Sequence, residues 1–185
     1  MRIAVLGAGG VFGQGFAQYA KDKGHDVLGI GRSPRKPEPY SLGSDFKYVE
    51  YGAWDAVQFL PEFDCVVNFA AQAGLVPQSW QYPEEFFHTN AMLPVRIALR
   101  LPKDCHYIHI GSSEVYGSVT APAGEDAPIN PSSPYAVSKA AADMHLMTLK
   151  DKLITMVRPS NCYAEGQALY RLIPRAVLAS LGGPK

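Results

Sequence analysis

The chain has 185 residues, of which 47% are hydrophobic and 18% charged, so it can bury the core of one sizeable domain but is short for two. Lysine plus arginine and aspartate plus glutamate both number 17, and this balance gives no basic face for a nucleic-acid partner. A neutral surface gives little colloidal protection, so we expect self-association, for example as a homodimer.

The first residues combine a basic side chain with an apolar run, as a signal peptide does, but the run ends at Gly7. No stretch approaches the ~20 apolar residues of a membrane span, so we expect no membrane partner. The three cysteines, Cys65, Cys105 and Cys162, fit neither a disulfide framework nor a metal-binding spacing. We interpret them as buried, reduced thiols of a cytoplasmic protein without a metal site.

Short apolar runs alternate with helical patterns along the whole chain. The runs are apolar throughout their length, which is typical of strands buried on both faces of a parallel sheet. The sequence therefore predicts an α/β fold with a Rossmann-type doubly wound parallel sheet, in one domain of residues 1–185. The predicted strands are Arg2–Leu6, Asp26–Ile30, Phe46–Val49, Cys65–Phe69, His106–Ile110 and Leu153–Val157. The predicted helices are Phe12–Lys23, a short Ala53–Leu60, Pro83–Leu101, Pro134–Lys150 and Arg171–Leu181.

A glycine-rich segment joins the first predicted strand to the first predicted helix. Gly7, Gly10 and Gly13 allow close backbone approach, and Val11 and Phe12 open the helix, whose free N–H groups favour a pyrophosphate. The spacing Gly-x-x-Gly-x-x-Gly differs from the Gly-x-Gly-x-x-Gly dinucleotide fingerprint. We predict a dinucleotide site here, and the alternative is a glycine-rich turn that binds no ligand.

The end of the second predicted strand indicates which dinucleotide would bind. An acidic residue there would bind the ribose hydroxyls of NAD. The chain has Gly31 instead, and Arg32 follows, which suits the 2′-phosphate of NADP. We therefore expect NADP, with NAD as the alternative, although a basic surface loop would have the same composition.

Tyr135 and Lys139 lie four residues apart on a helix that Pro134 can begin, so their side chains share a face. A neighbouring ammonium and an oxidised nicotinamide would both favour the phenolate, so Tyr135 is a candidate general base during hydride transfer. Ser112 lies just beyond a predicted strand, where an open sheet binds its ligand, and could orient a substrate hydroxyl. A chance pair on a helix surface and a serine that caps a short helix are the alternatives.

Several motifs follow one another in an order that covers nearly the whole chain. They are Gly7-x-x-Gly10-x-x-Gly13, Asn68-Phe69-Ala70-Ala71-Gln72-Ala73-Gly74, Gly111-Ser112-Ser113-Glu114-Val115-Tyr116-Gly117, Pro131-x-x-Pro134-Tyr135-x-x-Ser138-Lys139 and Arg158-Pro159-Ser160-Asn161-Cys162-Tyr163. With these motifs the chain resembles an extended short-chain dehydrogenase/reductase of the NAD-dependent epimerase/dehydratase family. The resemblance implies a Rossmann fold and action on nucleotide-linked sugars.

The resemblance also implies roles for individual residues, with the alternative that Glu114 only caps a turn. It places catalysis at Ser112, Tyr135, Lys139 and Glu114. It places the cofactor at Gly7, Gly10, Gly13, Ala70, Ala71, Tyr135 and Lys139, to which the reasoning from the residues themselves adds Val11, Phe12 and Arg32. It places the substrate at Ser79, Ser113 and Asn161, and it matches Asn90 to a structural position in a helix.

We therefore expect an NAD(P)-dependent epimerase or dehydratase that transiently removes hydride from a hydroxyl-bearing carbon of a nucleotide-sugar. One alternative is an NADPH-dependent keto-sugar or carbonyl reductase, which the Arg32 region favours. Another is a non-catalytic cofactor-binding protein, which the short length favours and the Ser/Tyr/Lys set opposes. Members of the family continue past the position of Lys185 into a substrate-binding lobe. We expect these residues to lack most of that lobe, to bind NAD(P) and to turn over poorly alone.

Overall fold

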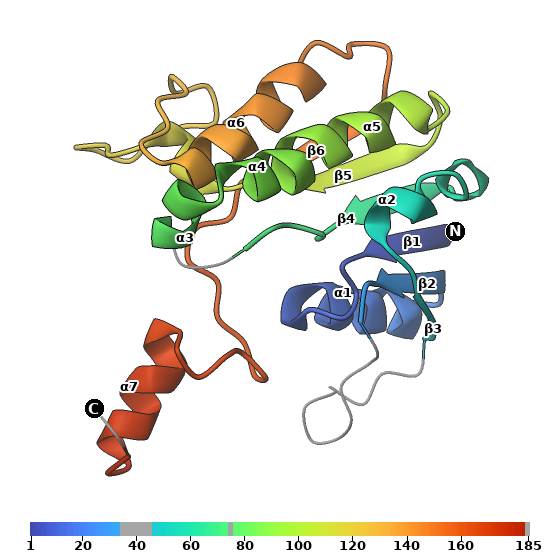
Figure 1. The fold of residues 1–185 in the computed structure, drawn as a ribbon. Coiled ribbons are helices and arrows are strands. Elements are labelled where there is room, and N and C mark those ends of the chain that lie inside the picture. The colour runs from blue at the N-terminus through green and yellow to red at the C-terminus, as the bar shows by residue number, and fades with distance from the viewer. Residues whose placement is uncertain (34–45, 74–75, 184–185) are drawn as a thin grey trace.

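The computed structural model describes residues 1–33, 46–73 and 76–183, and in it the six predicted strands form one parallel sheet of order β3-β2-β1-β4-β5-β6 (Figure 1). The strands are β1 (Arg2–Leu6), β2 (Asp26–Gly31), β3 (Lys47–Glu50), β4 (Cys65–Asn68), β5 (His106–Ile110) and β6 (Ile154–Val157). The order reverses between β1 and β4, which creates the topological switch point where doubly wound sheets bind ligands. The prediction of a Rossmann-type sheet is confirmed.

Helices and short helical turns connect the strands. The longer helices are α1 (Val11–Asp22), α5 (Leu93–Arg100), α6 (Pro134–Leu146) and α7 (Leu172–Ser180). The shorter segments are α2 (Ala53–Ala56), η1 (Leu60–Glu62), α3 (Val76–Gln81), α4 (Pro83–Phe86), the π-helical η2 (Phe87–Met92) and the 3-10 turn η3 (Ser113–Tyr116). The predicted helix Pro83–Leu101 is thus α4, η2 and α5 in succession, and α3 was not predicted.

Two hydrophobic layers cover the two faces of the sheet. Alternate side chains of a strand point to opposite faces, so Ile3 and Val5 of β1 pack on one side with Ala17 of α1. Ala4 and Leu6 pack on the other side, together with side chains of α5 and α6. Figure 1 shows α5 and α6 lying together over that second face. The core therefore holds α6 firmly against the carboxyl-terminal half of the sheet.

The prediction that every strand is buried on both faces is wrong for the two edge strands. β1 and β4 are buried almost throughout, whereas β3 and β6 consist of exposed and half-buried residues. Each edge strand pairs with a single neighbour and has less of a helical layer over it, so an apolar composition does not bring burial there. Helix α7 also has no buried residue, and Figure 1 shows it standing away from the sheet.

The cysteine prediction holds for two of the three thiols. Cys65 and Cys105 are buried and free, and burial raises the pKa of each to about 11. Cys162 is exposed, contrary to prediction, because it lies in the irregular segment between β6 and α7. Among the described residues, none of the helices is long and apolar enough to cross a membrane, and no group of His, Cys, Asp or Glu side chains could hold a metal ion.

Candidate active site and dinucleotide groove

The glycine loop forms a tight turn between β1 and α1. Gly7 has a positive φ of 78°, and the N–H groups of Gly7 and Ala8 donate to the carbonyl of Ile30 at 2.8 and 3.1 Å. A Cβ at Gly13 would overlap the carbonyl oxygen of Gly7, so the helix approaches the loop more closely than a side chain would allow. These contacts account for the glycines at two of the predicted positions.

The N-terminus of α1 faces outward without a capping side chain. Gly10 is its N-cap residue, in extended conformation, and makes no side-chain hydrogen bond to the first turn. The first N–H groups of a helix have no partners within the helix, so those of Val11, Phe12 and Gly13 suit an anion. The cradle of backbone N–H groups fits the pyrophosphate of a dinucleotide.

The loop after β4 lies against the glycine loop. A Cβ at Gly7 would come within 2.7 Å of the Ala70 nitrogen, so the two loops touch at the switch point between β1 and β4. Ala70 is half-buried, and its N–H donates to Oδ1 of Asn68 at 3.1 Å. Ala71 follows it, also half-buried. The structure therefore brings the predicted cofactor residues of β1, α1 and β4 together.

A tyrosine hydroxyl occupies the space beside the end of β2. A side chain at Gly31 would overlap the hydroxyl of Tyr48, and one at Gly9 would come within 2.9 Å of it. The Tyr48 hydroxyl donates to the carbonyl of Ser33 at 2.7 Å. Arg32 is exposed beside it. Sequence reasoning noted the missing acid at position 31 but missed the side chain that fills its place. The rest of the predicted loop, residues 34–44, lies outside the described residues.

Lys139 is buried at the centre of the catalytic set, with 3% of its surface exposed. Its ammonium donates to the carbonyl of Ile110, the last residue of β5, at 2.9 Å. Burial lowers the pKa of Lys139 to about 8, and the charge of Asp143 opposes that shift. Tyr135 lies one turn earlier on α6, as predicted, and Ser133 caps the helix by accepting from the Ala136 N–H at 3.1 Å.

Burial raises the pKa of Tyr135, although a hydrogen bond with Ser112 and the charge of Arg171 act in the opposite direction. The nearby Glu114 raises it further. This differs from the expectation that the lysine favours the phenolate, because in the protein itself desolvation outweighs every favourable group. The Tyr135 ring packs edge-on against Phe86, with 6.2 Å between centroids.

Ser112 fills the capping role that was its alternative reading, and its role toward a substrate hydroxyl stays a prediction. Its hydroxyl accepts from the N–H of Glu114 at 3.2 Å and so caps η3, and it also contacts Tyr135. Glu114 itself is exposed, and its charge acts on Tyr135. Ser113 is half-buried and lines a cavity of about 570 Å³ with Arg158. Ser112, Tyr135 and Lys139 therefore converge at the carboxyl end of β5.

The predicted substrate residues are more dispersed. Asn161 is exposed in the segment after β6. Ser79 is fully buried, and its hydroxyl donates within α3 to the carbonyl of Val76 at 2.7 Å, so helical packing accounts for it. No ligand contact tests either assignment, and both stay predictions.

Asn90 connects the loop after β4 to helix α6. Its side chain accepts from the N–H of Gln72 at 2.8 Å and donates to the Gln72 carbonyl at 3.1 Å. It also donates to the hydroxyl of Ser138 at 3.2 Å. It thus ties the loop after β4 to α6 from the π-helical turn η2, which fits the structural position that the family resemblance implied.

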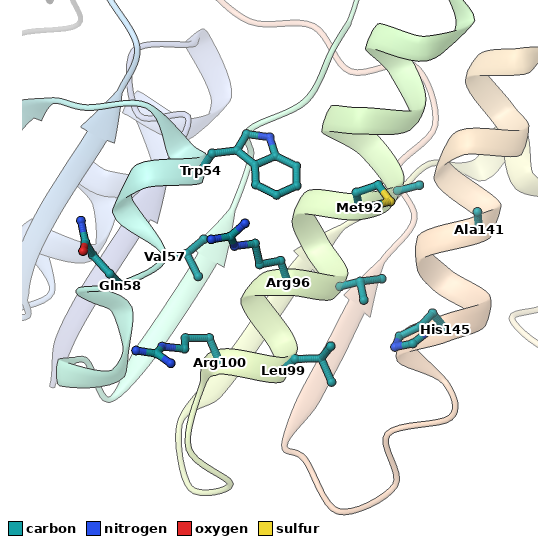
Figure 2. A pocket seen from close by; sticks show the side chains of 11 residues that line it. Trp54, Val57, Gln58, Met92, Arg96, Leu99, Arg100, Ala141 and His145 are labelled. Carbon is teal, nitrogen blue, oxygen red and sulfur yellow. The ribbon is translucent and has the colours of Figure 1, made fainter.

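A larger cavity, of about 790 Å³, lies away from these residues. Figure 2 shows Trp54 of α2, Arg96 of α5 and His145 of α6 around it. Arg96 lies over the Trp54 ring at 5.2 Å, and His88 stacks on that ring at 4.3 Å. None of the residues that line it belongs to the predicted catalytic or cofactor set, so its size alone does not mark it as the active site.

Comparison with known proteins yields one family. The family model described as NAD dependent epimerase/dehydratase family matches residues 3–184. A dTDP-glucose 4,6-dehydratase from Mycobacterium tuberculosis is 31% identical over 199 residues, which are 99% of this chain and 60% of the relative. A UDP-glucose 4-epimerase from Mycolicibacterium smegmatis is 33% identical over 184 residues, with 90% of this chain and 58% of the relative covered.

The solved structures show the same fold. A UDP-glucuronic acid 4-epimerase from Bacillus cereus, in complex with UDP-glucuronic acid and NAD, matches with a TM-score of 0.84 at 25% identity. That match covers 98% of this chain and 63% of the epimerase. The chain therefore spans about 60% of the length of the relatives that it matches.

Proposed function

We propose, since the chain belongs to the NAD dependent epimerase/dehydratase family, that it supplies the cofactor-binding and catalytic residues of an enzyme that acts on nucleotide-linked sugars. The observation that carries this proposal is the meeting of Ser112, Tyr135 and Lys139 at the carboxyl end of β5, beside the groove at the switch point. Relatives described as dehydratases and epimerases support the reaction class.

The dinucleotide would lie across the β1–β4 switch point. The open N-terminus of α1 would bind its pyrophosphate, and Ala70 and Ala71 would line the groove. When bound, it would accept hydride from a hydroxyl-bearing carbon and return it later in the reaction. Gly31 leaves the ribose without a carboxylate partner, and Arg32 suits a 2′-phosphate, so we propose a preference for NADP. The solved relatives contain NAD, which makes this preference a specific point to test.

Tyr135 would hold and move the proton in this reaction. Ser112 would align the substrate hydroxyl through the hydrogen bond that it shares with the tyrosine. Loss of the hydroxyl proton to Tyr135 requires a phenolate that burial disfavours, so the buried Lys139 ammonium and a cationic nicotinamide would supply the compensating charge. Glu114, exposed next to the tyrosine, is the candidate acid or base for a further proton transfer on the sugar.

The experiment uses stoichiometric protein, because we expect weak turnover from 185 residues that match 60% of their relatives. The chain is mixed with NAD or NADP and a panel of nucleotide-sugars, reduced nicotinamide is followed by absorbance, and products are identified by mass spectrometry. The Tyr135→Phe variant should lose about 10²–10⁴-fold in rate while calorimetry finds cofactor binding nearly unchanged. The matched control Tyr19→Phe changes an exposed tyrosine of α1 outside the site and should behave as wild type.

A wild-type rate from Tyr135→Phe would refute its role as the base. A chain that binds dinucleotide but transforms none of the sugars, even at high protein concentration, would instead favour a cofactor-binding protein. Reduction of a keto-sugar with no epimerised or dehydrated product would favour a reductase.

Self-association is a further part of the proposal. The exposed side chains of Met92, Leu99 and Met144 lie on η2, α5 and α6, and the first two line the larger cavity (Figure 2). Sedimentation of the wild type and of Leu99→Glu would test it, since a homodimer held by this face should dissociate in the variant. A concentration-independent monomer in the wild type would contradict the prediction.

A further inference from the structure

A buried carboxylate lies one helical turn beyond Lys139. Asp143 follows Lys139 by four residues on α6, so both side chains are on the face that packs against β5. Asp143 has no exposed surface. Its Oδ2 accepts from Nε of Arg158, just after β6, at 2.7 Å. A buried carboxylate needs a cation to offset its desolvation, and Arg158, which follows β6, supplies it.

The second oxygen of this carboxylate faces a buried histidine. Nε2 of His109 on β5 lies 3.7 Å from Oδ1 of Asp143, and neither atom has a hydrogen-bond partner in the described part of the chain. Nδ1 of His109 lies 3.5 Å from the hydroxyl of Tyr107, which in turn accepts from Nδ2 of Asn68 at 3.3 Å. A tyrosine that donates to Nδ1 leaves the imidazole proton on Nε2, directed at Asp143.

Among these groups, Asp143 is the acid and Arg158 is the cation that contacts it. Burial, with the Lys139 charge, lowers the pKa of His109 to about 3, so the imidazole is neutral at physiological pH. Burial raises the pKa of Tyr107 beyond its ordinary range, so it is neutral too. The guanidinium of Arg158 also donates to the hydroxyl of Tyr116 at 2.6 Å. The charge of Asp143 raises the pKa of Lys139, against the larger effect of burial.

Stability does not account for this arrangement. Burial raises the pKa of Asp143, although Arg158 and Lys139 act in the opposite direction, so ionising it inside the protein costs free energy. A buried ion pair is often no more stabilising than well-packed apolar side chains of the same volume. Desolvated charges of this kind are typical of functional sites, where they set the charge of a neighbour.

We propose that Asp143 is a positioning residue of the catalytic centre, a buried counter-ion that Arg158 holds in place beside His109, one helical turn from Lys139. The inference rests on the proposed function only in that Lys139 is taken as catalytic. Asp143 touches neither the substrate nor the cofactor in this account. It acts through Lys139, which stays charged against the Ile110 carbonyl and can therefore support the Tyr135 phenolate.

The experiment follows the ionisation of Lys139 directly, by NMR of isotope-labelled lysine side chains in the full 185-residue chain. The Lys139 signal is assigned by its loss in Lys139→Met. The wild type should titrate near pH 8. In Asp143→Asn the midpoint should fall by about one pH unit or more, because an opposite charge at this range is removed. Asp143→Glu should restore most of the shift. The control Asp151→Asn removes an exposed carboxylate paired with Lys103, and it should leave the midpoint unchanged.

A second variant covers the case in which Asp143→Asn does not fold because Arg158 is left unpaired. Asp143→Asn/Arg158→Met removes both charges and leaves no unpaired guanidinium, yet Lys139 still loses its counter-ion. An unchanged midpoint in either folded variant would overturn the proposal. In the wild type, the Lys139 signal should also respond when Asp143 is protonated at acidic pH, and a constant signal there would overturn it as well. Because no readout uses substrate or cofactor, failure of the proposed enzymatic function leaves these outcomes interpretable.

Discussion

The ammonium of Lys139 donates to the carbonyl oxygen of Ile110 at 2.9 Å, so a charge at the catalytic centre is anchored to the last residue of β5. This bond connects α6 to the sheet, and the ammonium is kept out of water. The low pKa of Lys139 follows from the same burial.

Lys139 should make the stability of the chain depend on alkaline pH. Its pKa falls from 10.5 to about 8 on folding, so between these values the unfolded chain binds more protons than the folded one. The free energy of unfolding of the wild type should therefore rise relative to Lys139→Met, by up to about 1.4 kcal/mol per pH unit. Urea unfolding of both proteins at neutral and alkaline pH measures this difference. A constant difference would contradict the burial of a charged lysine.

His109 should govern part of the response to acid. Its pKa falls from 6.5 to about 3, so its contribution to stability is complete above 6.5 and is lost as the pH falls through 3. The wild type should lose up to about 1.4 kcal/mol per pH unit relative to His109→Gln across this interval. Carboxylates remote from His109 titrate in the same way in both proteins and cancel from the comparison, whereas Asp143, which faces His109 at 3.7 Å, does not. Parallel pH profiles of the two proteins would mean that His109 already binds a proton in the folded state.

The glycine loop offers a matched pair of substitutions on one helix. In Gly13→Ala the new methyl group would overlap the Gly7 carbonyl, so we expect a loss of about 1–3 kcal/mol in stability and weaker dinucleotide binding. In Gly15→Ala the methyl group meets no atom within 4 Å. This control should gain about 0.5–1 kcal/mol, because alanine favours helix, and should bind dinucleotide as before. Thermal unfolding and calorimetric titration with dinucleotide compare the two variants. Equal effects on binding would show that the glycine loop is not part of the dinucleotide site.

Much of this site could be predicted from the sequence because its signals are local. The glycine loop, the Tyr135/Lys139 pair and Ser112 each lie within a few residues of a recognisable strand or helix end, and the family resemblance that they carried is confirmed. Asp143, Arg158 and His109 meet only in the folded chain, since they come from three elements.

The exposure of the edge strands and the π-helical turn also escaped prediction, for related reasons. An apolar run such as Ile154–Val157 has the same composition in the middle of a sheet and at its edge, and only the number of neighbours decides its burial. The spacing of apolar residues in Phe87–Met92 differs too little from that of an α-helix to reveal the wider turn. The position of Tyr48 could not be predicted either, because its hydroxyl approaches Gly31 only through the pairing of β2 with β3.

Cofactor choice provides the last prediction, in which Arg32 and Tyr48 are tested together. Arg32→Ala should weaken NADP binding by about one to two decades and leave NAD binding nearly unchanged, because only NADP presents a 2′-phosphate. Gly31→Asp alone should destabilise the chain without improving NAD binding, since the new side chain would overlap the Tyr48 hydroxyl. The double variant Gly31→Asp/Tyr48→Ala makes room for a carboxylate at the end of β2, where it can accept hydrogen bonds from the ribose of NAD.

Calorimetric titration of each variant with both dinucleotides separates these effects, and Tyr48→Ala alone serves as the control for the space that is opened. The double variant should favour NAD over NADP, through attraction of the ribose hydroxyls and repulsion of the phosphate by the new carboxylate. Two outcomes would contradict this prediction: a wild type that already prefers NAD, or equal losses of affinity for both dinucleotides in Arg32→Ala. Either would show that the end of β2 does not distinguish NADP from NAD at the ribose 2′ position.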